Sequence, residues 1–295
     1  QWLSGRLDRK EKAVEKGTHL HMQVQNKGRI RHGGDCKVSL VFITKLIFVY
    51  GGIQMDSLVR LKMIYGEEAV ANLEKKKVIV FGVGGVGSFT AEALARSGIG
   101  EITLVDFDRV SVTNINRQMP ARVNTVGRLK VEVVKEDILA INPECKVRIV
   151  SEVFKNPELT PGILTTDLDY IIDAIDDVPA KTELLIWAYE NKISVVSSMG
   201  AGNKIDPTAF RIADISKTHT CALARVIRKA LRNRGIKKGI TTVFSTEVPR
   251  KPQASAEKGG MKENPPGSVC HVTGTAGLIV ASVVINGLTQ KEEER

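Results

Sequence analysis

The sequence predicts an α/β protein built on a doubly wound, mostly parallel sheet of the Rossmann-like type. Short apolar runs rich in β-branched residues alternate with segments of helical periodicity, which is the pattern of a parallel sheet covered by helices. The run 77–81 leads directly into the pattern Gly82-x-Gly84-x-x-Gly87, and a helical segment follows it. A buried strand, a tight turn and a helix N-terminus in this order form a phosphate-binding arrangement.

The elements are expected in a regular order from residue 56 onward. Apolar residues at helical spacing predict a first helix over 56–73, and each later apolar run predicts a strand. The expected strands are 77–81, 101–106, 146–151, 169–173 and 194–198, and the helices between them are 86–98, 126–141 and 179–191. This spacing gives strand–helix–strand units, so we expect neighbouring strands to run parallel.

The second half of the chain changes character. The run 208–215 predicts a later, antiparallel strand of the sheet, and 241–245 predicts a short strand. We expect a basic helix over 221–234 and a long apolar helix over 269–288. Residues 246–268 are rich in Pro, Lys, Gly and Glu, which is typical of a mobile loop.

The first 54 residues differ from the rest in charge. The chain of 295 residues has a formal net charge of +10, and residues 1–54 hold ten Lys or Arg against four Asp or Glu. They also lack the periodicity of a domain. We therefore expect a non-native or disordered extension over 1–54 and the domain itself over 55–295. The alternative is a basic tail followed by an apolar anchor at 38–50, which is shorter than the roughly twenty residues of a membrane span.

Composition narrows the class of protein. The four cysteines, Cys36, Cys145, Cys221 and Cys270, form no C-x-x-C pair. This argues against a disulfide scaffold and a four-cysteine zinc site, and it favours a cytoplasmic location. Polar residues interrupt the apolar run 269–288, so we expect a buried helix and no stable membrane insertion. Membrane association through this run is the alternative.

Asp106 ends the strand that follows the glycine turn. An acid at this place binds a ribose hydroxyl in dinucleotide enzymes, so it does not discriminate between NAD and ATP. Arg117 and Lys130 discriminate better. A nicotinamide enzyme has no need of cations beside the phosphate turn, whereas cleavage of ATP at its α-phosphate builds negative charge that fixed cations stabilise. We therefore expect ATP as the nucleotide.

Acidic residues close the strand 169–173. Asp176 and Asp177 follow Asp173 at the expected carboxyl edge of the sheet, where ligands bind in open α/β folds. Because Mg²⁺ is held mainly through phosphates and one or two carboxylates, Asp176 is the expected metal ligand.

Five spaced motifs together resemble the signature of the E1-like adenylating enzymes, the family of the ubiquitin activators and of the bacterial molybdopterin and thiamine sulfur-carrier activators. The motifs are Gly82-x-Gly84-Gly85-x-Gly87-Ser88, Asp106-Phe107-Asp108, Asn114-x-x-Arg117-Gln118, Gly127-x-x-Lys130 and Asp173-x-x-Asp176. The resemblance implies an E1-like adenylation fold, ATP and Mg²⁺ as cofactors, and catalytic roles for Arg117, Lys130 and Asp176. The nucleotide site that it implies comprises Gly82, Gly84, Gly85, Gly87, Ser88, Asp106, Asp108, Asn114, Arg117, Lys130, Asp176 and Asp177.

Further stretches narrow the resemblance to one branch of this family. The runs 200–208, 243–247 and 91–98 are similar to the tRNA threonylcarbamoyladenosine dehydratases. That branch implies ATP-dependent activation of the carboxylate of threonylcarbamoyladenosine in tRNA, after which the acyl-adenylate cyclises with loss of AMP. One alternative is adenylation of the C-terminal glycine of a ubiquitin-like sulfur carrier, although those activators usually carry the paired C-x-x-C motif. A module that binds NAD without ATP chemistry is the other.

The sequence also indicates partners. Arg225, Arg228, Lys229 and Arg232 share the basic helix and form a candidate tRNA-binding patch, for which a solvated helix face is the alternative. The resemblance implies a homodimer and a sulfur-relay protein partner. Relatives commonly have an Arg-Phe-Gly-Gly element whose arginine reaches the partner subunit's ATP, and Arg60 is the substitute in this chain. We nominate no catalytic cysteine, because the substrate supplies its own nucleophile at high effective concentration.

Overall fold

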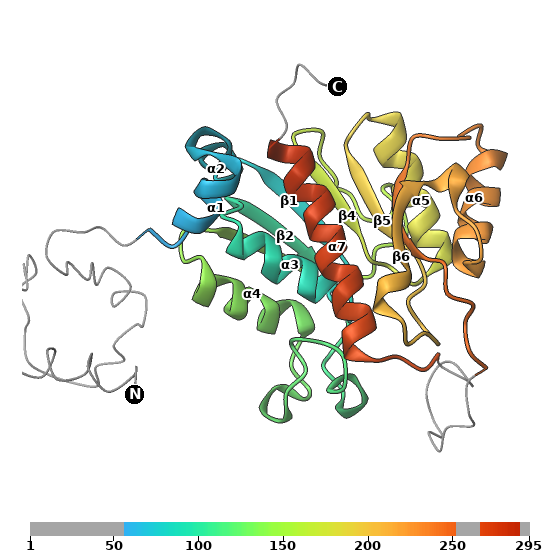
Figure 1. Cartoon of the computed structure of the whole chain (residues 1–295), viewed down its shortest axis with the longest axis horizontal. Coiled ribbons are helices and arrows are strands. Elements are labelled where there is room, and N and C mark those ends of the chain that lie inside the picture. The colour runs from blue at the N-terminus through green and yellow to red at the C-terminus, as the bar shows by residue number, and fades with distance from the viewer. Residues whose placement is uncertain (1–55, 252–265, 290–295) are drawn as a thin grey trace, which may run out of the picture. The chain divides into compact units, whose positions relative to one another are not determined.

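The computed structural model describes residues 56–251 and 266–289. Its centre is a seven-stranded sheet in the order β3-β2-β1-β4-β5-β7-β6 (Figure 1), in which β6 runs antiparallel to β7 and the other neighbours are parallel. The strands are β1 (Lys77–Phe81), β2 (Glu101–Val105), β3 (Lys146–Val150), β4 (Tyr170–Asp173), β5 (Val195–Ser198), β6 (Phe210–Asp214) and β7 (Thr241–Ser245). The strand order reverses between β1 and β4, which is where ligands bind in doubly wound folds.

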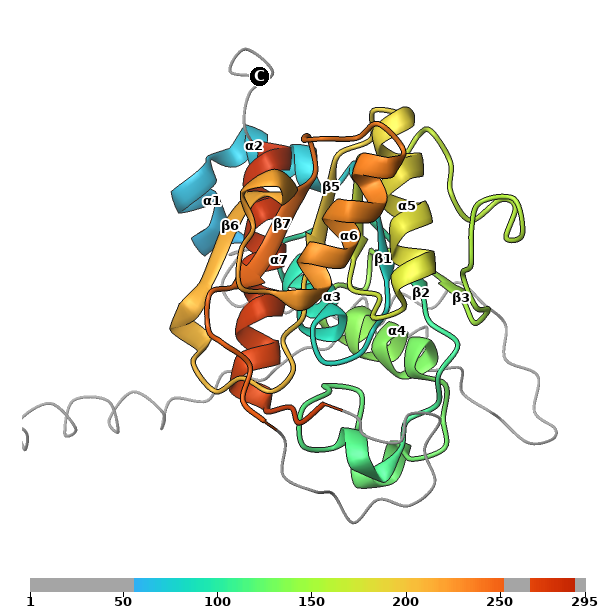
Figure 2. The same ribbon diagram turned by 90° about the vertical axis from the view of Figure 1, so that its right-hand side faces the viewer.

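Helices cover both faces of the sheet (Figures 1 and 2). The helices are α1 (Val59–Tyr65), α2 (Glu67–Leu73), α3 (Gly87–Arg96), α4 (Lys130–Ile141), α5 (Val178–Glu190), α6 (Ala222–Asn233) and α7 (Cys270–Thr289). Buried side chains of α2, α3, α4 and α7 form one core, and those of α5 and α6 form the other. In the described ranges, short 3₁₀ turns lie in the connections: η3 (Val112–Asn114), η4 (Val123–Thr125), η5 (Pro207–Ala209) and η6 (Ile215–Lys217).

Strand β1 shows why the sheet is buried on both sides. Val78 and Val80 belong to the core under α3, α4 and α7, whereas Ile79 and Phe81 belong to the core under α5 and α6. A strand covered by helices on both faces has no solvent side, so its sequence is a continuous apolar run. This burial makes β1 a rigid support for the glycine turn that follows it.

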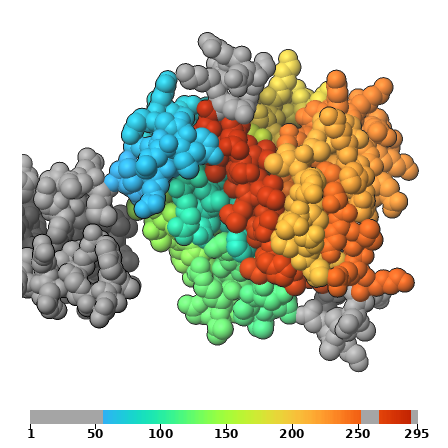
Figure 3. Space-filling view, in the orientation of Figure 1, coloured from blue at the N-terminus to red at the C-terminus, as the bar shows by residue number. Residues whose placement is uncertain are grey.

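The apolar helix α7 packs along α3. Thr90 donates its hydroxyl to the carbonyl oxygen of Gly277 at 2.9 Å, and a Cβ at Gly277 would lie 2.4 Å from the carbonyl oxygen of Val86. Glycine is therefore required for this close approach of two helices. By length and composition α7 could cross a membrane, and half of its 18-residue apolar window is buried in the described part of the domain. Its outer side forms a surface strip between α2 and β6 (Figure 3). The buried residues on its inner side confirm the predicted buried helix.

Two helix predictions need correction. The single helix predicted over 56–73 is two helices, because Gly66 adopts φ 85° between α1 and α2 and no continuous helix accommodates that conformation. The helix predicted over 126–141 begins only at Lys130. Gly127 adopts φ 87°, which keeps the preceding residues in a loop.

The later elements agree with their predictions. The antiparallel strand predicted over 208–215 is confirmed as β6, and the strand predicted over 241–245 is its partner β7. The extension predicted over 1–54 lies outside the described residues, and so do residues 252–265 of the predicted mobile loop.

Candidate functional site

The glycine turn joins β1 to α3 at the point where the strand order reverses. Gly82 adopts φ 82°, and a Cβ there would lie 2.7 Å from the carbonyl oxygen of Ala174. A Cβ at Gly87 would lie 1.8 Å from the carbonyl oxygen of Gly82. Only glycine permits this path, which brings the first turn of α3 against the ends of β1 and β4. The amide groups of that turn form an anion-binding site of the kind that holds a phosphate.

Neighbouring side chains stabilise the turn from behind. Ser88 is buried and donates its hydroxyl to the carbonyl oxygen of Gly84 at 2.6 Å. A Cβ at Gly85 would lie 3.2 Å from Thr273 of α7, so α7 packs against the turn. The hydroxyl of Ser88 therefore supports the loop in the structure, and its predicted contact with a nucleotide stays a prediction.

Asp106 lies beside the glycine turn, as an acid that binds a ribose should. Its carboxylate accepts hydrogen bonds from the backbone amides of Val83 and Asp108, each at 2.8 Å. Burial raises the pKa of this carboxyl above its usual value, and the nearby charge of Lys130 opposes that rise. The carboxylate is thus held in a fixed orientation at the end of β2.

Lys130 begins α4 and points into the same region. Its side chain is 6% exposed, and its ammonium group pairs with the carboxylate of Asp108 at 2.7 Å. The backbone amide of Lys130 also donates to the carbonyl oxygen of Asp108 at 3.0 Å. A buried ammonium that is anchored to a half-exposed carboxylate can bind a phosphate oxygen by exchanging one anion for another.

The segment after Asp108 carries the other predicted phosphate ligands. The side-chain oxygen of Asn114 accepts from the backbone amide of Ser111 at 3.1 Å and caps η3. The guanidinium of Arg117 donates to the carbonyl oxygen of Thr113 at 2.8 Å and to the side-chain oxygen of Asn116 at 2.9 Å. These local bonds hold the turn and orient Arg117. The phosphate contacts predicted for Asn114 and Arg117 stay predictions.

The acids after β4 have separate structural positions. Asp173 is fully buried and forms an ion pair with Lys181 at 2.8 Å. Asp177 accepts from the backbone amide of Ala180 at 2.9 Å and caps α5. Asp176 is exposed at the same edge of the sheet. No group of three or more potential metal ligands occurs among residues 56–251 and 266–289, but a single exposed carboxylate is a fitting donor for Mg²⁺ that phosphates and water otherwise hold.

The turn after β5 forms the second half of the carboxyl edge. The carboxylate of Glu247 accepts from the backbone amides of Ile205 at 3.1 Å and Asp206 at 3.0 Å. This chelation joins the runs 200–208 and 243–247, which the sequence singled out separately. The link could not be predicted, because it connects residues more than forty positions apart.

Two buried lysines were missed by sequence reasoning. Lys181 is 0% exposed, and besides Asp173 it donates to the carbonyl oxygens of Ile175 and Ser198. Lys204 is 3% exposed and donates to the carbonyl oxygen of Ser245 at 3.4 Å. Burial lowers the pKa of Lys204. The only sequence signal for either was a lysine within an otherwise apolar or glycine-rich segment.

The basic helix α6 presents three of its four predicted tRNA ligands to solvent. Arg225, Lys229 and Arg232 are exposed and lie at helical spacing on one side of α6. Arg228 is half-buried, and its guanidinium donates to the carbonyl oxygen of Thr218 at 2.9 Å. Arg228 therefore ties α6 to the preceding loop. Phosphate contact by all four residues stays a prediction.

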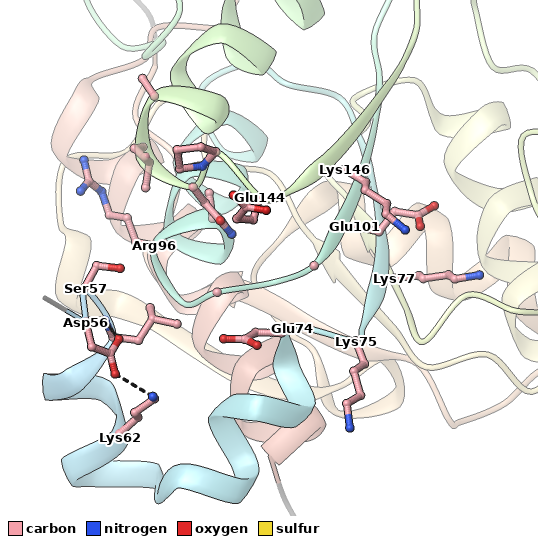
Figure 4. A pocket seen from close by; sticks show the side chains of 18 residues that line it. Asp56, Ser57, Lys62, Glu74, Lys75, Lys77, Arg96, Glu101, Glu144 and Lys146 are labelled. Atoms are coloured by element: carbon pink, nitrogen blue, oxygen red, sulfur yellow. Dashed lines mark hydrogen bonds and ion pairs between the residues drawn. The ribbon is translucent and has the colours of Figure 1, made fainter. Parts of the chain in front are cut away.

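A cavity of about 1360 Å³ opens at the opposite edge of the sheet (Figure 4). Residues at the amino ends of β1, β2 and β3 line it, among them Lys77, Glu101 and Lys146. Its lining mixes both signs of charge. Because ligands of open α/β folds bind at the carboxyl ends of the strands, this cavity does not belong to the nucleotide site.

The described cysteines lie in different environments. Cys145 and Cys221 are buried, whereas Cys270 is exposed at the first residue of α7. Burial raises the pKa of the Cys145 thiol to about 11. A thiol with such a pKa is almost entirely protonated at neutral pH and therefore a poor nucleophile.

Comparison with known proteins identifies the relatives of this site. Residues 55–295 match the ThiF family. The tRNA threonylcarbamoyladenosine dehydratase of Bacillus subtilis is 46% identical over 242 residues, which are 79% of this chain and 95% of that protein. The crystal structure of the Escherichia coli enzyme TcdA in complex with ATP superposes with a TM-score of 0.73 at 37% identity, covering 81% of this chain and 96% of that one. The molybdopterin-synthase adenylyltransferase of Escherichia coli is 31% identical over 156 residues, 53% of this chain and 61% of that protein.

Proposed function

The chain belongs to the ThiF family, and from this we propose that it is an ATP-dependent tRNA threonylcarbamoyladenosine dehydratase. The similarity to the Bacillus subtilis dehydratase covers 95% of that protein and 79% of this chain, whereas the similarity to the molybdopterin-synthase adenylyltransferase covers 53% of this chain. A function that depends on both halves of the domain is therefore supported better than one that depends on the nucleotide half alone.

One observation of the structure carries the proposal. The glycine turn and Asp106 lie at the same carboxyl edge of the sheet as the turn 200–208, and residues 266–273 contact both. In this proposal, ATP and the acyl substrate bind along this one edge. Formation of an acyl-adenylate requires this, because the carboxylate must reach the α-phosphate.

The reaction follows from the groups on this edge. The amides at the start of α3 bind phosphate oxygens, Asp106 accepts from the ribose hydroxyls, and Lys130 with Arg117 stabilises the charge that builds as pyrophosphate departs. Mg²⁺ bound by Asp176 and the phosphates would neutralise further charge on the nucleotide. The substrate carboxylate bonds to the α-phosphorus and pyrophosphate leaves. A nucleophile within the threonylcarbamoyl group then attacks the acyl carbon, loses its proton and releases AMP.

The purified protein is expected to dehydrate threonylcarbamoyladenosine in tRNA when ATP and Mg²⁺ are present. Mass spectrometry of the digested nucleosides should show loss of one water, with AMP and pyrophosphate formed only with the modified tRNA. An unchanged nucleoside mass contradicts the proposal. If pyrophosphate exchange instead responds to a ubiquitin-like carrier, the function is carrier adenylation, and preferential binding of NAD in calorimetry contradicts both ATP-dependent functions.

The reaction is expected to proceed without a cysteine nucleophile. Cys270 is the exposed thiol among the described cysteines, so iodoacetamide should label it while Cys145 and Cys221 are protected. The variant Cys270→Ser should retain wild-type turnover of the modified tRNA, because the substrate carries its own nucleophile. A loss of turnover without a loss of thermal stability would identify a catalytic cysteine and contradict this mechanism.

We also propose a homodimer, for which helix α1 supplies the supporting observation. Its side chains Val59, Met63 and Ile64 are 52%, 81% and 78% exposed, and none of its residues is buried. An apolar helix face of this kind is typical of a surface that a partner covers. Arg60 lies on the same helix and, by the family resemblance, would reach the nucleotide of the second subunit. Light scattering of the purified protein at several concentrations should give the mass of two chains. The mass of one chain at all concentrations would contradict the proposed dimer.

The other proposed partners are tRNA and, by resemblance, a sulfur-relay protein. We propose the cytoplasm as the location of the enzyme. Arg225, Lys229 and Arg232 form an exposed basic stripe that suits the phosphates of tRNA. If it contacts them, the affinity for tRNA should fall with increasing salt, and the fall should be less steep after Lys229→Ala. An unchanged salt dependence of that variant would remove Lys229 from the interface.

A further inference from the structure

Asn203 joins three parts of the chain at the carboxyl edge. Its backbone amide donates to the carbonyl oxygen of Gly267 at 2.7 Å, and its side-chain oxygen accepts from the amide of Gly267 at 2.7 Å. Its carbonyl oxygen accepts from the amide of Arg250, also at 2.7 Å. One residue of the turn after β5 thus binds both the chain that leaves β7 and the chain that enters α7.

The backbone at Asn203 is set to make these bonds. Asn203 adopts φ 60°, a conformation that asparagine tolerates better than most residues with a Cβ. The preceding Gly202 has no room for a side chain, because a Cβ there would lie 2.8 Å from the Cβ of Pro266. The conformation of Asn203 and the absence of a side chain at Gly202 therefore allow residues 202–203 to approach residues 266–267 closely.

The chain held by Asn203 continues to the nucleotide half of the edge. The side-chain amide of Asn116 donates to the carbonyl oxygen of Ser268 at 2.8 Å. Further along, His271 contacts the carbonyl oxygen of Ile205 at 3.2 Å, and Thr273 packs against Gly85. Residues 266–273 therefore connect the turn that holds Asn203 with the turn that holds Asn116 and its neighbour Arg117.

We propose that Asn203 is a positioning residue for adenylate formation: by holding Gly267 it places Ser268 where it orients Asn116, and with it Arg117. This inference rests on the proposed function, since Arg117 is the expected phosphate ligand. It assigns a role to a residue that touches no reacting atom. If the hydrogen bond between Asn203 and Gly267 served stability alone, variants of equal stability would carry out the chemical step at the same rate.

The variant Asn203→Gly isolates the side-chain contact. Glycine adopts φ 60° without strain and keeps both backbone hydrogen bonds, so among the described residues the variant loses only the bond from the amide of Gly267. Asn203→Asp retains the acceptor oxygen. Lys192→Gly is the matched control, because Lys192 is exposed, adopts φ 57° after α5 and lies away from the carboxyl edge.

The expected result is a fall in kcat with little change in binding. Asn203→Gly should lower kcat for AMP release with modified tRNA about 10- to 100-fold, because small misplacements of a catalytic group cost that much. Its KM for ATP should stay close to the wild-type value, Asn203→Asp should restore most of kcat, and Lys192→Gly should behave as wild type. A wild-type kcat in Asn203→Gly overturns the inference. So does a fall in kcat that is the same in Asn203→Gly and Asn203→Asp and that parallels a fall in their melting temperatures.

Hydrogen exchange separates this inference from the proposed function. Without any substrate, the amides of residues 113–118 and of Gly267 and Ser268 should exchange faster in Asn203→Gly than in the wild type or in Lys192→Gly. Equal exchange in all three overturns the positioning role whatever the enzyme catalyses. Faster exchange in a protein that dehydrates no tRNA would support the link and leave the proposed function as the part that failed.

Discussion

Replacing Lys130 by alanine should slow adenylate formation about 30- to 1000-fold, which corresponds to roughly 2–4 kcal/mol of lost transition-state stabilisation. The ammonium group lies in a nearly buried position, paired with Asp108 and near Asp106. Charge in such a site is screened little by solvent, so its interaction with a departing pyrophosphate is strong. Lys130→Arg keeps the charge and should retain part of the rate. Single-turnover release of AMP from modified tRNA measures the effect.

The matched control for this variant lies on the same helix. Lys135 is half-buried in α4, and no ion pair is recorded for it in the described part of the chain. Lys135→Ala should slightly raise the helix propensity of α4 and keep the wild-type rate. Arg117→Ala tests the second cation and should show a loss of similar size. Unchanged turnover in both Lys130→Ala and Arg117→Ala would show that the nucleotide site is misassigned.

Replacing Lys181 by methionine should lower the free energy of unfolding by about 3–5 kcal/mol, because it leaves an uncompensated buried charge. The carboxylate of Asp173 is 0% exposed and would retain only the hydroxyl of Ser197, at 2.6 Å, and the amide of Ile175, at 3.1 Å. The substitution would also remove the ammonium group that donates to the carbonyl oxygen of Ser198 at 2.8 Å. Urea unfolding measures the change as a shift of the midpoint at constant slope.

A second ion pair, near the opposite end of β4, provides the control. Lys76 and Asp169 form an ion pair of 2.9 Å just before β4, with side chains 24% and 27% exposed. Lys76→Met should cost only about 0–1 kcal/mol, because solvent screens a pair at the surface. The double variant Asp173→Leu with Lys181→Met should recover much of the lost stability, since it removes both buried charges. Equal losses in Lys181→Met and Lys76→Met would contradict the burial argument.

The sequence predicted most of the fold, because the signals involved are local. The apolar run 77–81 and the glycines after it are contiguous, and each residue in them has one dominant physical reason. The antiparallel placement of 208–215 was also predicted and is confirmed by its register with β7. The errors occurred at Gly66 and Gly127, where a positive φ ends or delays a helix that the apolar periodicity alone would extend.

Local signals also predicted where some of the candidate site residues lie, although their roles stay predictions. Asp106 follows β2 and Lys130 begins α4, and the structure places Asp106 beside the turn that begins at Gly82 and Lys130 close to Asp106. The predicted ligand Arg228 is tied to Thr218, a contact that depends on how the loop before α6 folds back. The charge of a residue can be read from the sequence, but the partner of that charge depends on distant chain segments.

The fold class, the phosphate-binding turn and the family signature can be read from the sequence alone, because they depend on neighbours along the chain. The buried pairing of Asp173 with Lys181, and the hydrogen bonds by which Asn203 joins Arg250 to Gly267, become visible only in the folded structure. Those contacts arise where segments far apart in sequence meet at the carboxyl edge of the sheet. No local sequence pattern predicts these contacts, because they are stabilised by burial and hydrogen bonding between segments rather than within them.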